Sequence, residues 1–247
     1  LIGFDSVFIL SQAILVLFSK SNPVLNKIFS NSYLNFGVST LMMIMISVSM
    51  VRLILKNNRN NIYLLLLFGA TLSTLVRSIA NYVEVLLDPT SFQQLKAATS
   101  VTLTNMNSSI VLLVSSLMIL IVMILVNQRH ELDVMLLKQD NATALGVPYL
   151  RRLNTYLILI SLGMSITTAL VGPLTFLGLI AVNIAKSITD DYRHGSIFFV
   201  SSMVAMLMLI FGQTLVEFTR YATPVSVLIH FFGGIYMIYL MVKEVKP

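Results

Sequence analysis

Histidine and cysteine are the residues most often used for metal binding and proton transfer, and in this sequence they form no recognisable site. The three histidines, His130, His194 and His230, fall in different segments, and cysteine is absent. The lack of cysteine removes disulfides, thiolate metal ligands and cysteine nucleophiles. The apolar segments also lack clustered carboxylates and any nucleophile accompanied by a base and an orienting group. We therefore predict no catalytic residue, no metal site and no cofactor bound by this chain.

A short segment near the middle of the chain carries helix start and stop signals. Asp140 is a residue type that caps helix N-termini, Gly146 can adopt the left-handed conformation that ends a helix, and Pro148 prevents continuation. One or two turns of helix are predicted inside residues 127–152, the most charged segment, which we expect to lie in water. Such a helix is more often a simple connection. Between two membrane spans, however, it could also offer a soluble motor protein a rigid contact.

The composition indicates that most of the chain lies in a membrane. Hydrophobic residues make up 57% and charged residues only 11%, with a mean hydropathy of +0.89, whereas soluble domains carry roughly 25% charged residues. A span of the hydrocarbon core needs about 20 apolar residues, and a lipid-exposed span must satisfy its own backbone hydrogen bonds. We predict an all-α polytopic membrane protein. The net charge of +6 reflects basic residues near the ends of spans, so no nucleic acid partner is expected.

About eight membrane segments are predicted, one of them short. Residues 153–185 contain no charge and are too many for one crossing, and Gly172 with Pro173 is expected to end one helix and start a shorter returning one. Gly178 is assigned to the same break. The predicted segments are 2–19, 34–55, 62–78, 108–126, 153–171, 174–187, 197–216 and 224–242.

Lysine and arginine are distributed unequally between the two sides of this arrangement. Residues 52–61, 127–152 and 186–195 and the C-terminus fall on one side and hold 11 of the 16 basic residues. Cytoplasmic loops normally carry this excess, so these regions, including the C-terminus, are predicted to be cytoplasmic. The chain opens at Leu1 inside an apolar span, without an initiator methionine, and we expect residues 1–247 to be one N-terminally incomplete permease domain.

The sequence resembles the vitamin B12 and iron-siderophore permease family of ABC importers over nearly its whole length. The likeness is most specific in residues 140–147 (DNATALGV) and 168–179 (TALVGPLTFLGL), with further matches at 132–134, 211–213 and 232–236. Family members typically have ten membrane segments, which implies that the first two are missing here. The resemblance implies that a coupling helix, which sits in a cleft of the ATPase, is formed by Gln139, Asp140, Asn141, Ala142, Thr143, Ala144, Leu145, Gly146 and Val147.

The same resemblance implies the partners of the chain. They are the lipid bilayer, a second permease subunit as homo- or heterodimer, two ATP-binding cassette subunits that carry ATP and Mg²⁺, and an extracellular siderophore-binding lipoprotein, for which Arg220 is the candidate docking residue. Many members have glycine before the coupling helix where this chain has Lys138. Together with Val182-Asn183 and Lys186, this departure resembles a subgroup associated with catecholate siderophores.

Two other classes of membrane protein remain as alternatives. An ion-coupled transporter would carry ionisable residues in mid-membrane, and the charge-free windows count against it. A non-transporting membrane scaffold is compatible with the composition.

Overall fold

The computed structural model describes residues 3–20, 23–57, 62–101, 103, 106–189, 193–219 and 224–244, and these form helices joined by short connections. The predicted all-helical class is therefore confirmed for the described residues. The helices are α1 (Phe4–Ser19), α2 (Pro23–Ser30), α3 (Ser32–Asn57), α4 (Ile62–Leu86), α5 (Pro89–Thr99), α6 (Ser108–Asn127), α7 (Arg129–Met135), α8 (Lys138–Ala144), α9 (Tyr149–Val171), α10 (Leu177–Ile188), α11 (His194–Phe218) and α12 (Val225–Glu244).

Helix α4 continues to Leu86, past residue 78 where the third predicted membrane segment ends. Isolated polar residues such as Glu84 do not stop a helix, whereas the residue before a proline is disfavoured in the helical conformation. The chain accordingly turns at Asp88, and Pro89 begins α5 at the position where its missing N–H costs nothing. Residues 81–101 thus contain the end of α4 and all of α5.

Over the described residues, four helices are long and apolar enough to cross a membrane. The qualifying stretches are Ser32–Ser49, Ser108–Asn127, Tyr149–Val171 and His194–Phe218, and shorter apolar stretches lie at Asp5–Ser19, Leu177–Ile188 and Val225–Tyr236. Outward-facing apolar side chains such as Leu112 and Met123 of α6 are mostly exposed, as suits helices in contact with lipid. The chain is a multi-pass membrane protein, and the count of eight segments stays a prediction.

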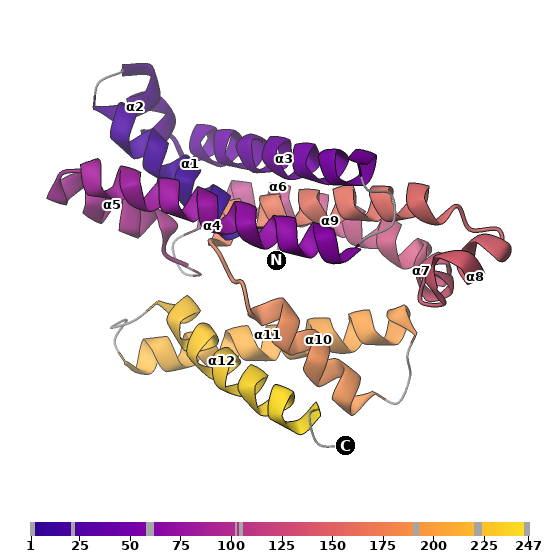
Figure 1. The fold of residues 1–247 in the computed structure, drawn as a ribbon. Helices are drawn as coiled ribbons and strands as arrows, with labels where there is room; N and C mark the ends of the chain where they lie inside the picture. Colours follow the sequence, from indigo (N-terminus) through magenta and orange to yellow (C-terminus); the bar gives the residue numbers. More distant parts are fainter. Residues whose placement is uncertain are drawn as a thin grey trace.

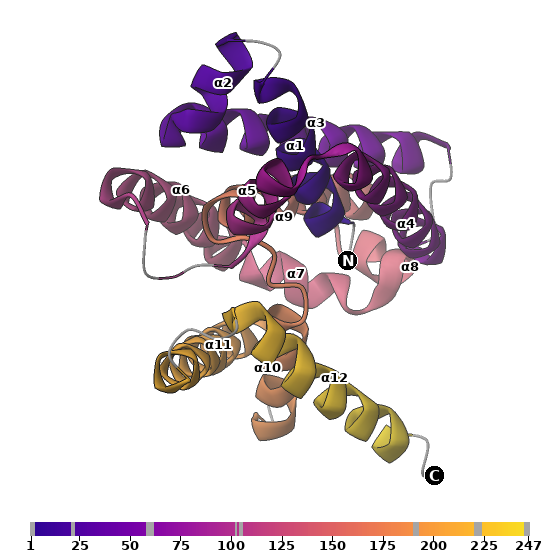
Figure 2. The ribbon, with the colours of Figure 1, turned by 90° about the vertical axis from the view of Figure 1, so that its left-hand side faces the viewer.

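The helices form two groups, which Figures 1 and 2 show one above the other. Helices α1–α6 and α9 make the N-terminal bundle, in which α1 packs against α3 and α4 and α9 packs against α3 and α6. Helices α10–α12 make the C-terminal bundle, whose apolar core contains Leu177, Val216, Val225 and Ile229.

Small polar residues lie where helices approach closely in the N-terminal bundle. Ser11, Ser39, Ser161 and Ser165 are almost completely buried, and the hydroxyls of Ser11 and Ser165 donate to carbonyls within their own helices. Small residues at helix interfaces allow tight backbone packing in a membrane, where no hydrophobic force drives helices together.

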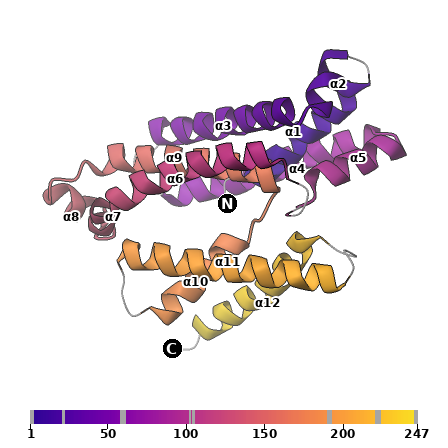
Figure 3. The same cartoon turned by 180° about the vertical axis from the view of Figure 1, so that it is seen from behind.

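Several of the segments predicted to be cytoplasmic lie toward one end of the molecule. In Figure 1 the end of α3, the helices α7 and α8, the start of α9, the end of α10 and the start of α11 all lie toward the right. The view from behind in Figure 3 shows the same grouping at the left. The helices α2 and α5 lie at the opposite end, so the chain alternates between the two ends as the sequence pattern requires.

Candidate functional site

The candidate site is the α7–α8 segment, which connects two candidate membrane helices, α6 and α9. Helix α8 ends in a Schellman motif. Gly146 has φ +87°, its N–H donates to the Thr143 carbonyl, and the Val147 N–H donates to the Ala142 carbonyl, each at 3.0 Å. This pattern satisfies carbonyls that a helix end otherwise leaves without partners. Pro148 then occupies the N-cap of α9, so α8 is joined to α9 by a short, well-defined turn.

The start of α8 differs from the sequence prediction, in which Asp140 was the capping residue. Leu137 is the N-cap and makes no side-chain cap hydrogen bond, while Asp140 lies within the first helical turn. A carboxylate there still interacts favourably with the helix dipole. The chain reverses at Lys138, whose φ of +71° is left-handed. Glycine adopts that conformation without steric cost, which accounts physically for the glycine expected at this position in the family.

The surface of α8 separates into a buried and an exposed side. Ala142 has no exposed surface, whereas 63% of Leu145 is exposed. Asp140, Asn141 and Thr143 are exposed as well. A single exposed leucine is ordinary on a protein surface, but among the residues predicted for coupling Leu145 offers the largest exposed apolar side chain. Of the nine residues predicted for coupling, Leu145 is therefore the best placed to contact a partner, and Ala142 holds α8 in its own fold.

Helix α7 is attached to α9 by an ion pair. The Arg152 guanidinium contacts the Glu131 carboxylate at 2.7 Å through Nε and donates to its second oxygen at 2.8 Å through Nη2. The Tyr156 hydroxyl, on a buried side chain, donates to Glu131 at 3.3 Å. A two-point arginine–carboxylate pair fixes orientation as well as distance.

A second carboxylate of α7 faces the C-terminal bundle. Asp133 Oδ1 accepts a hydrogen bond from the His194 backbone N–H at 2.8 Å and lies 2.8 Å from His194 Nδ1. Burial raises the pKa of Asp133. The two hydrogen bonds from His194 and the charges of His194 and His130 together outweigh burial, so the pKa of Asp133 lies below its ordinary value. Asp133 is thus a carboxylate at neutral pH and caps the start of α11.

The predicted helix break separates α9 from α10. Helix α9 ends at Val171, and Gly172, with φ +95° and ψ 178°, turns the chain toward Leu177, where α10 begins. A Cβ on Gly172 would lie 3.2 Å from Cγ2 and 3.3 Å from Cα of Val101. Assigning Gly178 to the break was wrong, because Gly178 lies inside α10 with open space around it. Glycine in a sequence does not by itself indicate a turn.

The predictions about docking and about metals stay predictions. Arg220, the candidate docking residue, lies outside the described residues. Over the part of the chain that the structure describes, no three potential ligands gather into a metal site. That ATP and Mg²⁺ bind on partner subunits stays a prediction.

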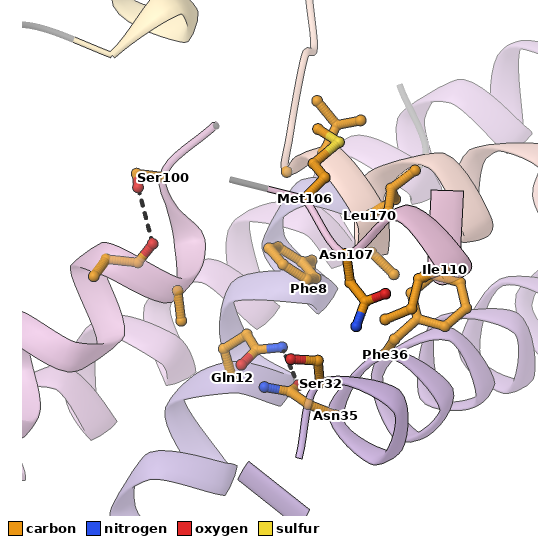
Figure 4. A pocket seen from close by; sticks show the side chains of 15 residues that line it. Phe8, Gln12, Ser32, Asn35, Phe36, Ser100, Met106, Asn107, Ile110 and Leu170 are labelled. Carbon is orange, nitrogen blue, oxygen red and sulfur yellow. Dashed lines mark hydrogen bonds between the residues drawn. The ribbon is translucent and has the colours of Figure 1, made fainter. Parts of the chain in front are cut away.

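A polar cavity of about 310 Å³ lies near the end of the molecule opposite α8, and it was not expected from the sequence. Figure 4 shows Gln12 of α1 and Asn35 of α3 facing each other there. The Gln12 amide nitrogen donates to Asn35 Oδ1 and Ser39 Oγ, both at 2.8 Å. Among the described residues no donor reaches Gln12 Oε1. The feature of the sequence that could have predicted this cavity is the presence of two amide side chains, Gln12 and Asn35, within apolar segments.

Comparison with known proteins agrees with this architecture. The chain is 34% identical over 249 residues to the petrobactin import system permease protein YclO of Bacillus subtilis, covering 100% of this chain and 78% of that protein. It is 27% identical to the petrobactin import system permease protein FatC of Bacillus anthracis, covering 99% of this chain and 68% of that one.

A solved structure has the same fold. An inward-facing conformation of a metal-chelate type ABC transporter superposes with a TM-score of 0.81 over 98% of this chain and 75% of that one, at 18% identity. The family model described as the FecCD transport family matches residues 1–243. The chain therefore belongs to the FecCD transport family.

Proposed function

We propose that this chain is the membrane permease of an ABC importer that brings a ferric siderophore of the catecholate type into the cytoplasm. The observation that carries the proposal is the α7–α8 segment, a rigid helix with an exposed Leu145 held between candidate membrane helices of a FecCD-family chain. The substrate class is supported by the two relatives described as petrobactin import permeases, petrobactin being a catecholate-type siderophore.

The end of the molecule that carries α8 is proposed to face the cytoplasm, together with the C-terminus. The basic excess on this side supports that orientation, because positively charged loops are retained in the cytoplasm. Residues 139–147 would then meet one of two ATP-binding cassette subunits. A binding lipoprotein would deliver the substrate at the opposite end, near α2 and α5.

Transport requires no chemistry in this chain. The proposed cycle passes the ferric complex along the boundary with a second permease subunit, and no substrate bond is broken. ATP-driven closure of the two motor subunits moves both α8 helices and shifts the permease between outward-open and inward-open states. In this cycle the permease makes different contacts in its outward-open and inward-open states, and the partner subunits hydrolyse ATP.

Uptake by the reconstituted transporter tests the function. Proteoliposomes that contain the chain, its ATPase and its binding protein are expected to accumulate a ⁵⁵Fe-labelled catecholate siderophore when ATP is supplied, and to accumulate much less of a hydroxamate complex. A proton or sodium gradient without ATP should drive nothing. Uptake driven by the gradient alone would favour the ion-coupled alternative, and ATP-driven uptake of the hydroxamate alone would contradict the substrate class.

Cysteine labelling tests the orientation, and the cysteine-free chain is a ready background. We expect Asn141→Cys to react with a membrane-impermeant maleimide only in inverted vesicles. Gln93→Cys, on the exposed side of α5 at the other end, should react in intact cells. The unmodified chain controls for labelling elsewhere. Reaction of the residue-141 variant in intact cells would place α8 outside and end the coupling proposal.

A further inference from the structure

Helix α7 lies between the two bundles and presents one carboxylate to each. Glu131 and Asp133 are two positions apart, which places their side chains about 200° apart around the helix axis. Glu131 bonds Arg152 in the first turn of α9, and Asp133 bonds His194 at the start of α11. The two acidic residues therefore tie one short helix to two different membrane helices.

The attachment to α9 is orientationally fixed and partly shielded from solvent. About a third of each partner side chain is exposed, 33% for Glu131 and 34% for Arg152. Exposed ion pairs contribute little because their side chains stay mobile and screened. Here the two-point geometry and the hydroxyl of the buried Tyr156 restrict the carboxylate to one orientation. A displacement of α7 is therefore transmitted to the first turns of α9.

The attachment to α11 is made at the end of that helix. Asp133 accepts from both the backbone and the ring of His194, and it acts as a capping residue supplied by another helix. The backbone of α11 also approaches α7 closely, since a Cβ on Gly195 would lie 3.4 Å from Cδ and Nη1 of Arg129. This end of α11 therefore moves with α7 as long as the Asp133 bonds hold.

Helix α8 is connected through the chain more directly to the N-terminal bundle than to the C-terminal bundle. The turn at Gly146 and Pro148 joins α8 directly to α9, but the chain reaches α11 only after passing through α9 and α10. The shortest physical route from α8 to the C-terminal bundle runs through the two-residue link Leu136-Leu137, α7 and the Asp133–His194 contact. We infer that Glu131 and Asp133 are positioning residues that divide the coupling motion, Glu131 directing it to α9 and Asp133 to α11. This inference rests on the proposed function.

The ratio of iron imported to ATP hydrolysed tests this role in the complete reconstituted transporter. Glu131→Ala and Asp133→Ala are each expected to lower the ratio at least about fivefold, the lower end of common coupling effects, while the ATPase still co-purifies with the permease. Glu84→Ala is the matched control, because it removes an ion pair with Lys96 (3.1 Å) at the opposite end of the molecule. The control should keep the ratio of the unmodified protein.

A charge swap separates positioning from simple structural support. Glu131→Arg and Arg152→Glu are each expected to lower the ratio, and the double variant is expected to recover a large part of it. Unchanged ratios in both alanine variants would overturn the inference. So would loss of the permease–ATPase complex in these variants, since the pairs would then maintain the fold only. Absence of ATP-driven uptake by the unmodified chain would instead overturn the proposed function itself.

Discussion

Leu145→Asp is expected to abolish ATP-driven uptake while the chain stays folded. The side chain is 63% exposed and occupies the C-cap of α8, so aspartate meets water in the free permease at little cost. In the complex it would face the motor subunit as a desolvated charge without a partner. As a hot spot of that interface, Leu145 is expected to contribute about 2 to 4 kcal/mol, or roughly 30- to 700-fold in Kd. Titration of the ATPase onto the detergent-solubilised permease measures this change.

Leu145→Met is the matched control, because it keeps the apolar volume and should bind the ATPase nearly as well as the unmodified chain. Ala142→Asp gives a different result, since Ala142 has no exposed surface and a charge there must break the packing of α8 itself. It should lower the thermal stability of the free permease. Normal ATPase affinity and uptake in the Leu145→Asp variant would show that α8 is not the coupling surface.

Gly172→Ala is expected to destabilise the permease by about 2 to 6 kcal/mol. The combination of φ +95° and ψ 178° is essentially restricted to glycine, and imposing it on another residue costs about 1 to 3 kcal/mol. The added Cβ would also press on Val101 at 3.2 to 3.3 Å, and overpacking adds about 1 to 3 kcal/mol. Unfolding in mixed micelles at increasing denaturing detergent measures the loss.

Gly178→Ala is the matched control for that substitution. Gly178 lies inside α10, and no atom outside its own local helix backbone lies within 4 Å of the place where a Cβ would stand. Because Gly178 is the second residue of α10, alanine there should leave the stability unchanged or raise it by less than about 1 kcal/mol. Equal destabilisation by the two variants would show that close helix packing around both glycines, and not the backbone conformation of Gly172, decides the effect.

Signals that depend on near neighbours in the sequence were predicted well. The predicted span at 108–126 corresponds to α6 (Ser108–Asn127), and the span at 224–242 corresponds to α12 (Val225–Glu244). The predicted left-handed Gly146 adopts φ +87°. Hydrophobic runs and helix-ending residues act within a few positions, so they can be read without knowing the rest of the fold.

Other expectations failed because several conformations suit the same local sequence. Asp140 is a good capping residue, but Leu137 is the N-cap and α8 begins at Lys138, three positions earlier than a cap at Asp140 would place it. The third predicted membrane segment ends near position 78, but α4 continues to Leu86, because a change from apolar to polar side chains does not by itself end a helix. Family resemblance predicted a coupling role for residues 139–147 without showing which of their side chains are exposed.

The sequence by itself determined that this protein is a helical membrane chain, where most of its helices lie, and that a short capped helix interrupts them between α6 and α9. Only the tertiary structure decided that the helices form two bundles and that α7 is bonded to both. The physical reason is the separation along the sequence between the residues that interact. Hydropathy and capping act between neighbours, whereas the Asp133–His194 bond joins residues 61 positions apart, and that distance closes only after the helices have packed.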